Sequence, residues 1–208
     1  MQFKSVKKIL FPLIKGGQEW QNININGKDE KPKFYLSDVQ WFLFIISILI
    51  IFKLTKGISK DLIGYIMSAF SISVSLFMSL LVSIFDKFEN TNLSILGKNE
   101  EEIVRLKQKK NFFKRFISIT SYLVVLSIFI IILCSINYIF DLSLKIDLNQ
   151  FTIEYDEIDI YLTIKFSLLI IYRILLNYFL LNYLFLTLFV TSSAYEYYIS
   201  EINRRKIQ

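Results

Sequence analysis

Hydrophobic residues gather in four runs along the chain, separated by polar segments. The clearest run lies between Asp61 and Asp86, where no residue is charged. At about 1.5 Å per residue, a helix of this length crosses the hydrocarbon core of a bilayer. The pattern therefore predicts an all-α integral membrane protein with four transmembrane helices, and it places them at residues 37–54, 61–85, 116–140 and 161–199.

The second predicted helix has one face of small side chains. With 3.6 residues per turn, these small residues fall within one arc, and large apolar residues occupy the other side. Helices in lipid associate through close packing of small side chains, because lipid tails are as apolar as the helices themselves. We expect this face to serve helix packing or oligomerisation; its residues are Gly64, Ser68, Ser71, Ser75 and Ser79.

The third predicted helix repeats small or polar residues every seven positions, at Thr120, Ser127 and Cys134. A seven-residue repeat predicts a left-handed packing seam. We expect three larger residues to fill the same face, namely Val124, Ile131 and Tyr138. Cys134 is interpreted as a small packing residue, because apolar surroundings disfavour the reactive thiolate.

Residues 1–36 are predicted to form a cytoplasmic arm that begins with an interfacial amphipathic helix. Apolar residues recur at helical spacing through residues 1–15, with lysines among them. Such a helix is too short to span a bilayer and is typical of a segment lying on an anionic lipid surface. From Gly16 to Pro32 we expect a loop or a partner-docking arm, with a candidate strand at Trp20–Ile25.

Local signals predict where the helices begin and end. Ser37 with Gln40 has the form of a capping box, and Asn99 with Glu102 repeats it. Gly57 suits the end of the first helix and Ser59 the start of the second. No helix breaker follows Asn99, so one helix is expected to continue from there to residue 140, and residues 86–115 form a cytoplasmic loop and helix extension.

Basic residues cluster before the third span, at Lys107, Lys109, Lys110, Lys114 and Arg115. This set is a candidate lipid or partner surface, because a polybasic patch beside a membrane binds anionic headgroups, or else nucleic acid. The simpler interpretation is an anchor required by topology. We favour that interpretation and do not expect direct binding of nucleic acid.

The period of the pattern changes from helical to alternating in residues 141–160. Apolar residues alternate with polar ones on both sides of Asn149-Gln150, which predicts a small extracytoplasmic β-hairpin. The segment is rich in acids and has one base, Lys145. An acidic loop of this kind is tolerated on the outer side of a membrane.

Polar residues interrupt the last predicted span. Arg173 and Asn177 lie one turn apart on one face, and Asn182 points elsewhere. An ionisable residue inside a span is a candidate functional site. Two interpretations of Arg173 remain open. In one, it reaches the outer interface and meets hairpin acids; in the other, it lines or gates a pore. The acids are Asp156, Glu157 and Asp159.

Charge sets the expected orientation. The formal net charge is +6, with bases concentrated in the N-terminal arm, in residues 86–115 and in a cytoplasmic tail at 200–208. Basic segments remain in the cytoplasm. We expect a multi-pass protein of the cell inner membrane with both termini inside, although three lysines of the first outer turn oppose this orientation: Lys53, Lys56 and Lys60.

Composition limits the chemistry. The sequence has no histidine and one cysteine, so the usual metal ligands and proton shuttle are missing. No phosphate-binding glycine loop and no nucleophile paired with a base is evident. We expect no enzyme activity, no cofactor and no metal site.

Two functions from different classes fit this chain. In the first, it is an oligomeric anchor or sensor subunit that holds a soluble cytosolic effector at the membrane, with membrane lipids and copies of itself as further partners. In the second, it is a channel-like effector whose oligomer depolarises the cell. Stripes of serine and threonine suit tight packing more than conduction, and no filter motif is present, so we prefer the first.

The order of segments resembles small four-span membrane subunits of bacterial antiphage defence systems, such as the Kiwa-type membrane component. The shared features are a lysine-rich arm, a tight first hairpin of helices, a charged cytoplasmic helix at residues 86–115 and an acidic outer loop. The resemblance covers the topology of the whole chain and assigns no individual residue. It implies an inner-membrane homo-oligomer that works with a separately encoded cytosolic effector.

Overall fold

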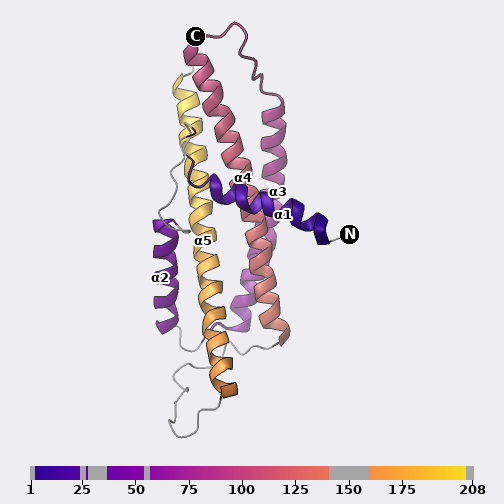
Figure 1. Ribbon diagram of the computed structural model, residues 1–208, viewed down its shortest axis with the longest axis vertical. Helices are drawn as coiled ribbons and strands as arrows, with labels where there is room; N and C mark the ends of the chain where they lie inside the picture. Colours follow the sequence, from indigo (N-terminus) through magenta and orange to yellow (C-terminus); the bar gives the residue numbers. More distant parts are fainter. Residues whose placement is uncertain (1–2, 24–26, 28–36, 54–56, 141–159, 205–208) are drawn as a thin grey trace. The chain divides into compact units, whose positions relative to one another are not determined.

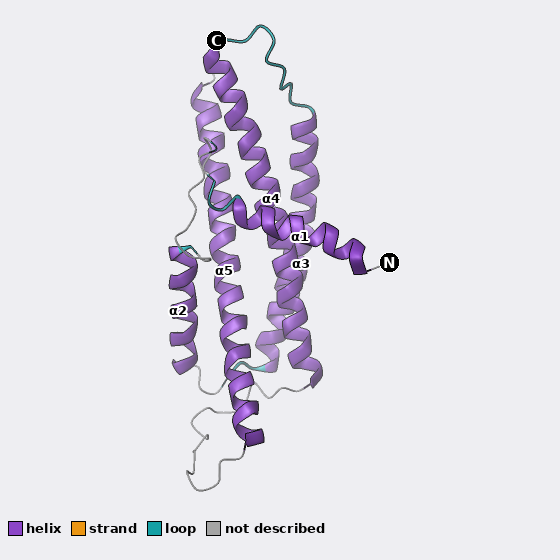
Figure 2. Ribbon diagram, in the orientation of Figure 1, coloured by secondary structure: helices purple, strands orange, loops and turns teal. Residues whose placement is uncertain are grey.

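The chain forms five α-helices (Figure 1). A computed structural model describes residues 3–23, 27, 37–53, 57–140 and 160–204. The helices are α1 (Phe3–Glu19), α2 (Asp38–Lys53), α3 (Lys60–Glu89), α4 (Glu100–Phe140) and α5 (Ile160–Arg204). Within the described residues every regular element is a helix, as Figure 2 shows. Residues 141–159, which hold the predicted β-hairpin, lie outside the described part of the chain.

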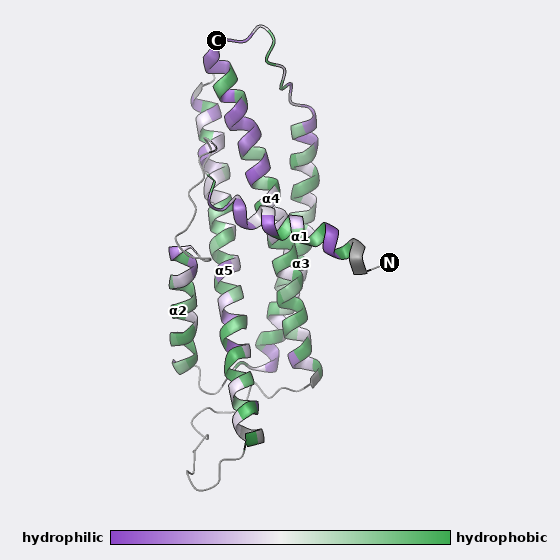
Figure 3. Ribbon diagram, viewed as in Figure 1, coloured by the Kyte–Doolittle hydropathy of each residue, from purple (hydrophilic) through white to green (hydrophobic). Residues whose placement is uncertain are grey.

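Three of the helices are long and apolar enough to cross a membrane. They are α3, α4 over residues Glu100–Ile139 and α5 over residues Thr163–Asn203. Figure 3 shows apolar residues along most of these helices and a polar stretch at the start of α4. The first predicted span, residues 37–54, corresponds to α2, which has 16 residues, fewer than the roughly 20 that a crossing helix needs.

Side chains cap the starts of α2 and α4 as the sequence predicts. The Ser37 amide donates to Gln40 Oε1 at 3.0 Å, and the Gln40 amide donates back to Ser37 Oγ at 3.3 Å. At α4 the Asn99 amide donates to Glu102 Oε2 at 3.0 Å. These bonds satisfy amides that the first turn of a helix leaves without a partner.

Gly57 and Ser59, which lie between α2 and α3, have conformations that fit the sequence prediction. Gly57 has a φ of 79°, a left-handed conformation that glycine adopts without steric cost at the end of a helix. Ser59 then starts α3, because its Oγ accepts a hydrogen bond from the Leu62 amide at 3.2 Å.

The helices pack into two units. Unit 1 comprises residues 1–33, 74–125 and 185–208, so it contains α1, the second part of α3, the first part of α4 and the last part of α5. Unit 2 comprises residues 34–73 and 126–184, so it contains α2 and the remaining parts of α3, α4 and α5. In each unit α4 is antiparallel to α5. The contacting pairs are Phe112 with Tyr197 and Arg115 with Phe189 in unit 1, and Phe129 with Phe179 and Leu133 with Tyr172 in unit 2.

A buried seam runs along α4. Its residues alternate in spacing between three and four, which is the spacing of left-handed helix packing. They are Phe113, Phe116, Thr120, Leu123, Ser127, Ile130, Cys134 and Asn137. Thr120, Ser127 and Cys134 are 0% exposed.

The prediction of which larger residues complete this seam is only partly correct. Val124 is buried and Ile131 is half-buried, but Tyr138 is 59% exposed. The seam is completed by residues that follow each small residue by three positions instead of four. Steps of three and of four both return close to the same side of a helix, so the repeat alone does not distinguish them.

The first helix is longer than predicted. The expected loop does not begin at Gly16, because α1 continues through both glycines to Glu19. Gly17 is buried against Tyr122 of α4, and this tertiary contact offsets the weak helix propensity of glycine. The candidate strand Trp20–Ile25 does not begin at Trp20, since Trp20 and Gln21 lie in a turn. Ile23 is a single bridge residue, and Asn24 and Ile25 lie outside the described residues.

Candidate functional site

The helices of unit 1 change from uncharged to charged sequence at a common level. The first charged residues next to the uncharged run of each helix are Asp86 and Lys87 on α3, Arg115 on α4 and Glu196 on α5. The first charges of three separate helices thus mark one boundary across this unit, which we call the charge boundary.

Aromatic contacts establish that these positions are level with one another. The Lys87 ammonium lies 4.9 Å from the centre of the Tyr198 ring, which joins α3 to α5. Phe112 stacks on Tyr197 with ring centres 4.0 Å apart and planes 9° apart, which joins α4 to α5. Phe88 completes the cluster from α3 by an edge contact with Phe113 at 5.3 Å.

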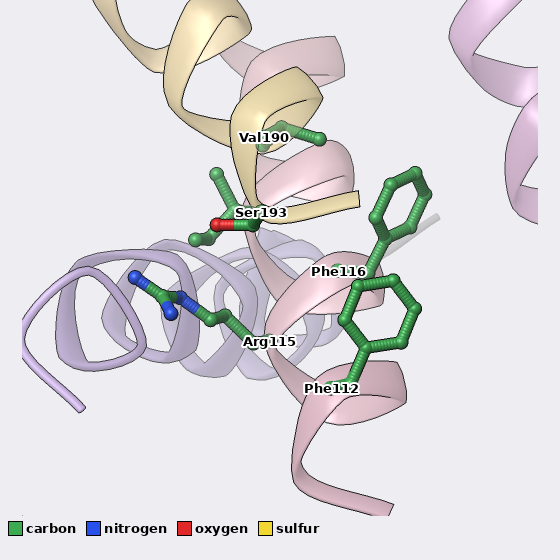
Figure 4. A pocket seen from close by; sticks show the side chains of 6 residues that line it. Phe112, Arg115, Phe116, Val190 and Ser193 are labelled. Carbon is green, nitrogen blue, oxygen red and sulfur yellow. The ribbon is translucent and has the colours of Figure 1, made fainter. Parts of the chain in front are cut away.

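Arg115 lies at the charge boundary itself. Its guanidinium carbon is 4.4 Å from the centre of the Phe189 ring, so the cation rests on an aromatic face. Figure 4 shows this side chain extending away from Phe112 and Phe116. The hollow that these residues share with Val190 and Ser193 has a volume of only about 10 Å³, so the helices are closely packed here.

The other predicted basic residues differ in exposure. Lys107, Lys110 and Lys114 are exposed, whereas Lys109 is half-buried. Lys109 lines a second hollow of about 150 Å³ between α4 and α5, together with Arg105 and the acids Glu196 and Glu201. The charged end of unit 1 therefore presents bases mainly from α4, with acids facing some of them from α5.

The predicted small face of α3 lies on the surface of the chain. Ser68, Ser71, Ser75 and Ser79 are exposed, and a β carbon added at Gly64 would meet nothing within 4 Å. The opposite side of α3 packs within the chain. Its seam residues are buried or half-buried and have the same alternating spacing: Ile63, Met67, Phe70, Val74, Phe77, Leu81, Ile84 and Phe88.

The serine hydroxyls of α3 bond within their own helix. Ser71 Oγ donates to the Met67 carbonyl oxygen at 2.8 Å, and Ser79 Oγ donates to the Ser75 carbonyl oxygen at 3.1 Å. Hydroxyl groups bonded one turn back need no water, so this face can enter an apolar contact without leaving those donors unsatisfied.

Arg173 lies inside unit 2. It is 2% exposed and occupies a buried seam of α5 that also contains Leu169, Leu176 and Tyr183. The side chain therefore does not extend to the surface of the chain. Asp156, Glu157 and Asp159, the acids considered as its partners, lie outside the described residues.

Further polar side chains are buried on α4 and α5. Tyr172 Oη donates to the Leu133 carbonyl oxygen at 2.6 Å, with Asn137 and Cys134 as neighbours. Asn182 is 2% exposed and, among the described residues, its Oδ1 accepts no hydrogen bond. Asn177 is half-buried. The polar residues predicted in the last span are thus interior or partly interior, each on α5.

Sequence reasoning missed several residues that hold these elements together. Gly17, Tyr122, Tyr172 and Tyr197 gave no signal of their own, because each acts through a neighbour on another helix. Asn137 had a detectable signal: it follows Cys134 by three positions, which is the spacing of the α4 seam.

Comparison with protein-family models, curated proteins and solved structures finds no match. Among the described residues, no three histidine, cysteine, aspartate or glutamate side chains come close enough to hold a metal ion. The geometry of the chain itself therefore supplies the argument for function.

Proposed function

We propose that this chain is an inner-membrane anchor or sensor subunit that assembles with copies of itself and holds a soluble cytosolic effector at the membrane. In this proposal α3, α4 and α5 cross the bilayer, α2 is a shorter fourth span, and the charge boundary of unit 1 lies at the cytoplasmic surface. Bacterial antiphage defence is the setting that the order of segments suggests.

The exposed small face of α3 is the observation that carries the proposal. The outer surface of α3 also exposes large residues such as Ile72, Leu76 and Val82. Beside them, the small side chains leave room for another helix to approach closely in lipid. The hydroxyls of Ser71 and Ser79 on this face are already bonded one turn back, so burying them costs little desolvation. A second copy of α3 is the simplest partner, because both copies have the same orientation in the membrane.

The charged end of unit 1 supplies the surface for the soluble partner. Large apolar side chains are exposed there beside the bases of α4: Leu96 is 92% exposed, Ile202 62% and Val104 53%. Exposed apolar residues next to charges are typical of protein docking surfaces. The partner is expected to offer acidic and apolar side chains.

Leucine substitutions on the small face test the assembly. Ser71→Leu and Ser75→Leu place bulk where close approach is required, so each should lower the mass of the detergent-solubilised oligomer, measured by light scattering after size exclusion. Ser73→Leu is the matched control, because Ser73 lies on the far side of α3. An unchanged mass for both Ser71→Leu and Ser75→Leu would remove the small-face argument.

A channel-like effector is the second candidate function, and the burial of Arg173 favours it. Ionisable residues inside spans often mark ion pathways. In this alternative the oligomer conducts ions and depolarises the cell, and Arg173 has a gating role. The membrane potential of cells that make the chain distinguishes the two functions.

A further inference from the structure

Helix α1 consists of a packed half and an exposed half. In the packed half, Leu13 and Ile14 are half-buried and Gly17 is buried. In the exposed half, Ile9 and Phe11 are each 62% exposed, and Val6 and Leu10 are 36% and 37% exposed. The exposed half needs an occupant, because so many uncovered apolar residues on one turn and a half of helix are unfavourable in water.

The packed half fixes α1 at a defined height on α4. Gly17 lies so close to Tyr122 that a β carbon there would come within 2.7 Å of Tyr122 Cγ. The Gln18 side chain forms a hydrogen bond with Tyr122, and a β carbon at Gly16 would lie 3.9 Å from Ser118 Oγ. Within unit 1, Figure 1 shows α1 running across α4 with its N-terminal end pointing away from it.

This height is the one that an interfacial helix requires. Ser118 and Tyr122 follow Arg115 by about one and two turns, into the uncharged run of α4. At 1.5 Å per residue, α1 therefore crosses α4 roughly 5–10 Å beyond the charge boundary. Amphipathic helices that lie in a membrane surface bury their apolar face to about that depth.

The charges of the exposed half match an anionic surface. Lys7 and Lys8 are exposed, and no acid occurs in α1 before Glu19. Lys7, Lys8, Phe11 and Pro12 line an open hollow of about 460 Å³. Lysine ammonium groups there can bind lipid phosphates, while Ile9 and Phe11 reach the acyl chains.

We propose that residues 6–12 of α1 lie in the interfacial layer of the membrane and bind anionic phospholipid headgroups through Lys7 and Lys8. The packed half transmits the position of this arm to α4 through the contact of Gly17 with Tyr122. The inference rests on the membrane placement of unit 1 in the proposed function, and it does not depend on oligomer assembly.

A fluorescent probe on the exposed half tests the inference. The full chain carrying Cys134→Ala and Ile9→Cys is labelled with a polarity-sensitive dye and reconstituted into phosphatidylcholine vesicles with or without phosphatidylglycerol. The dye should emit at shorter wavelength and be quenched by brominated lipid when phosphatidylglycerol is present. Lys7→Gln and Lys8→Gln should each shift the equilibrium between bound and free arm about fivefold towards the free arm.

Lys15→Gln is the matched control. It removes the same charge, but Lys15 lies in the packed half and pairs with Glu19 at 3.6 Å, so the dye signal should not change. A dye in water with both vesicle types would overturn the inference. A signal that depends on the ratio of protein to lipid, and not on phosphatidylglycerol, would also overturn it and assign this face to a second copy. The oligomer mass of the same samples reports separately on the proposed function.

Discussion

At the scale of single residues, Arg173 is a charged side chain buried among apolar neighbours on α5. Its position inside an apolar run marks it as exceptional from the sequence alone. The sequence left two directions open for the side chain, and the structure buries it at 2% exposure in the seam of α5. A long side chain can reach the surface or fold inwards from the same position, and only the neighbouring helices decide which.

Arg173→Leu separates a structural role from a gating role. Leucine has nearly the volume of the arginine side chain and buries no charge, so the variant should keep the packing of the α5 seam and assemble. If the chain is an anchor, expression of the unsubstituted chain or of Arg173→Leu should leave the membrane potential unchanged. A voltage-sensitive dye measures this potential. Depolarisation by the unsubstituted chain that Arg173→Leu abolishes, with assembly intact, would instead support the channel.

At the scale of elements, the helices and their caps were predictable because their signals are local. The capping boxes at Ser37 and Asn99 and the turn at Gly57 depend on residues within one helical turn of each other. The end of α1 was not predictable, because it depends on Tyr122, a hundred residues away in the chain. The face that completes the α4 seam was missed for the same reason, since its choice depends on α5.

The docking of α1 on α4 gives a prediction at this scale. Gly17→Ala should detach the packed half, because its β carbon has no room beside Tyr122, at an expected cost of about 1–3 kcal/mol for overpacking. Hydrogen exchange of the amides of residues 13–19 should become faster. Gly16→Ala is the control, since its β carbon would make an ordinary contact at 3.9 Å. Equal protection in the two variants would contradict this account of the docking.

At the scale of the whole molecule, composition and run length predicted a helical chain with helices suited to a membrane. The described residues agree in the three long helices. The charge boundary could not be read from the sequence, because Lys87, Arg115 and Glu196 belong to different helices and only packing brings them level. The proposed function also requires that copies of the chain contact one another through α3.

Cysteine cross-linking in native membranes tests that central claim most directly. Ser71→Cys and Ser75→Cys are introduced separately into a chain with Cys134→Ala, and membranes are treated with a mild oxidant. Since a contact through the small face brings identical positions of two copies together, both variants should form disulfide-linked dimers, whereas Ser73→Cys should remain monomeric on denaturing gels. Equal dimer formation by Ser73→Cys would contradict assembly through this face, and so would the absence of dimers from all three variants.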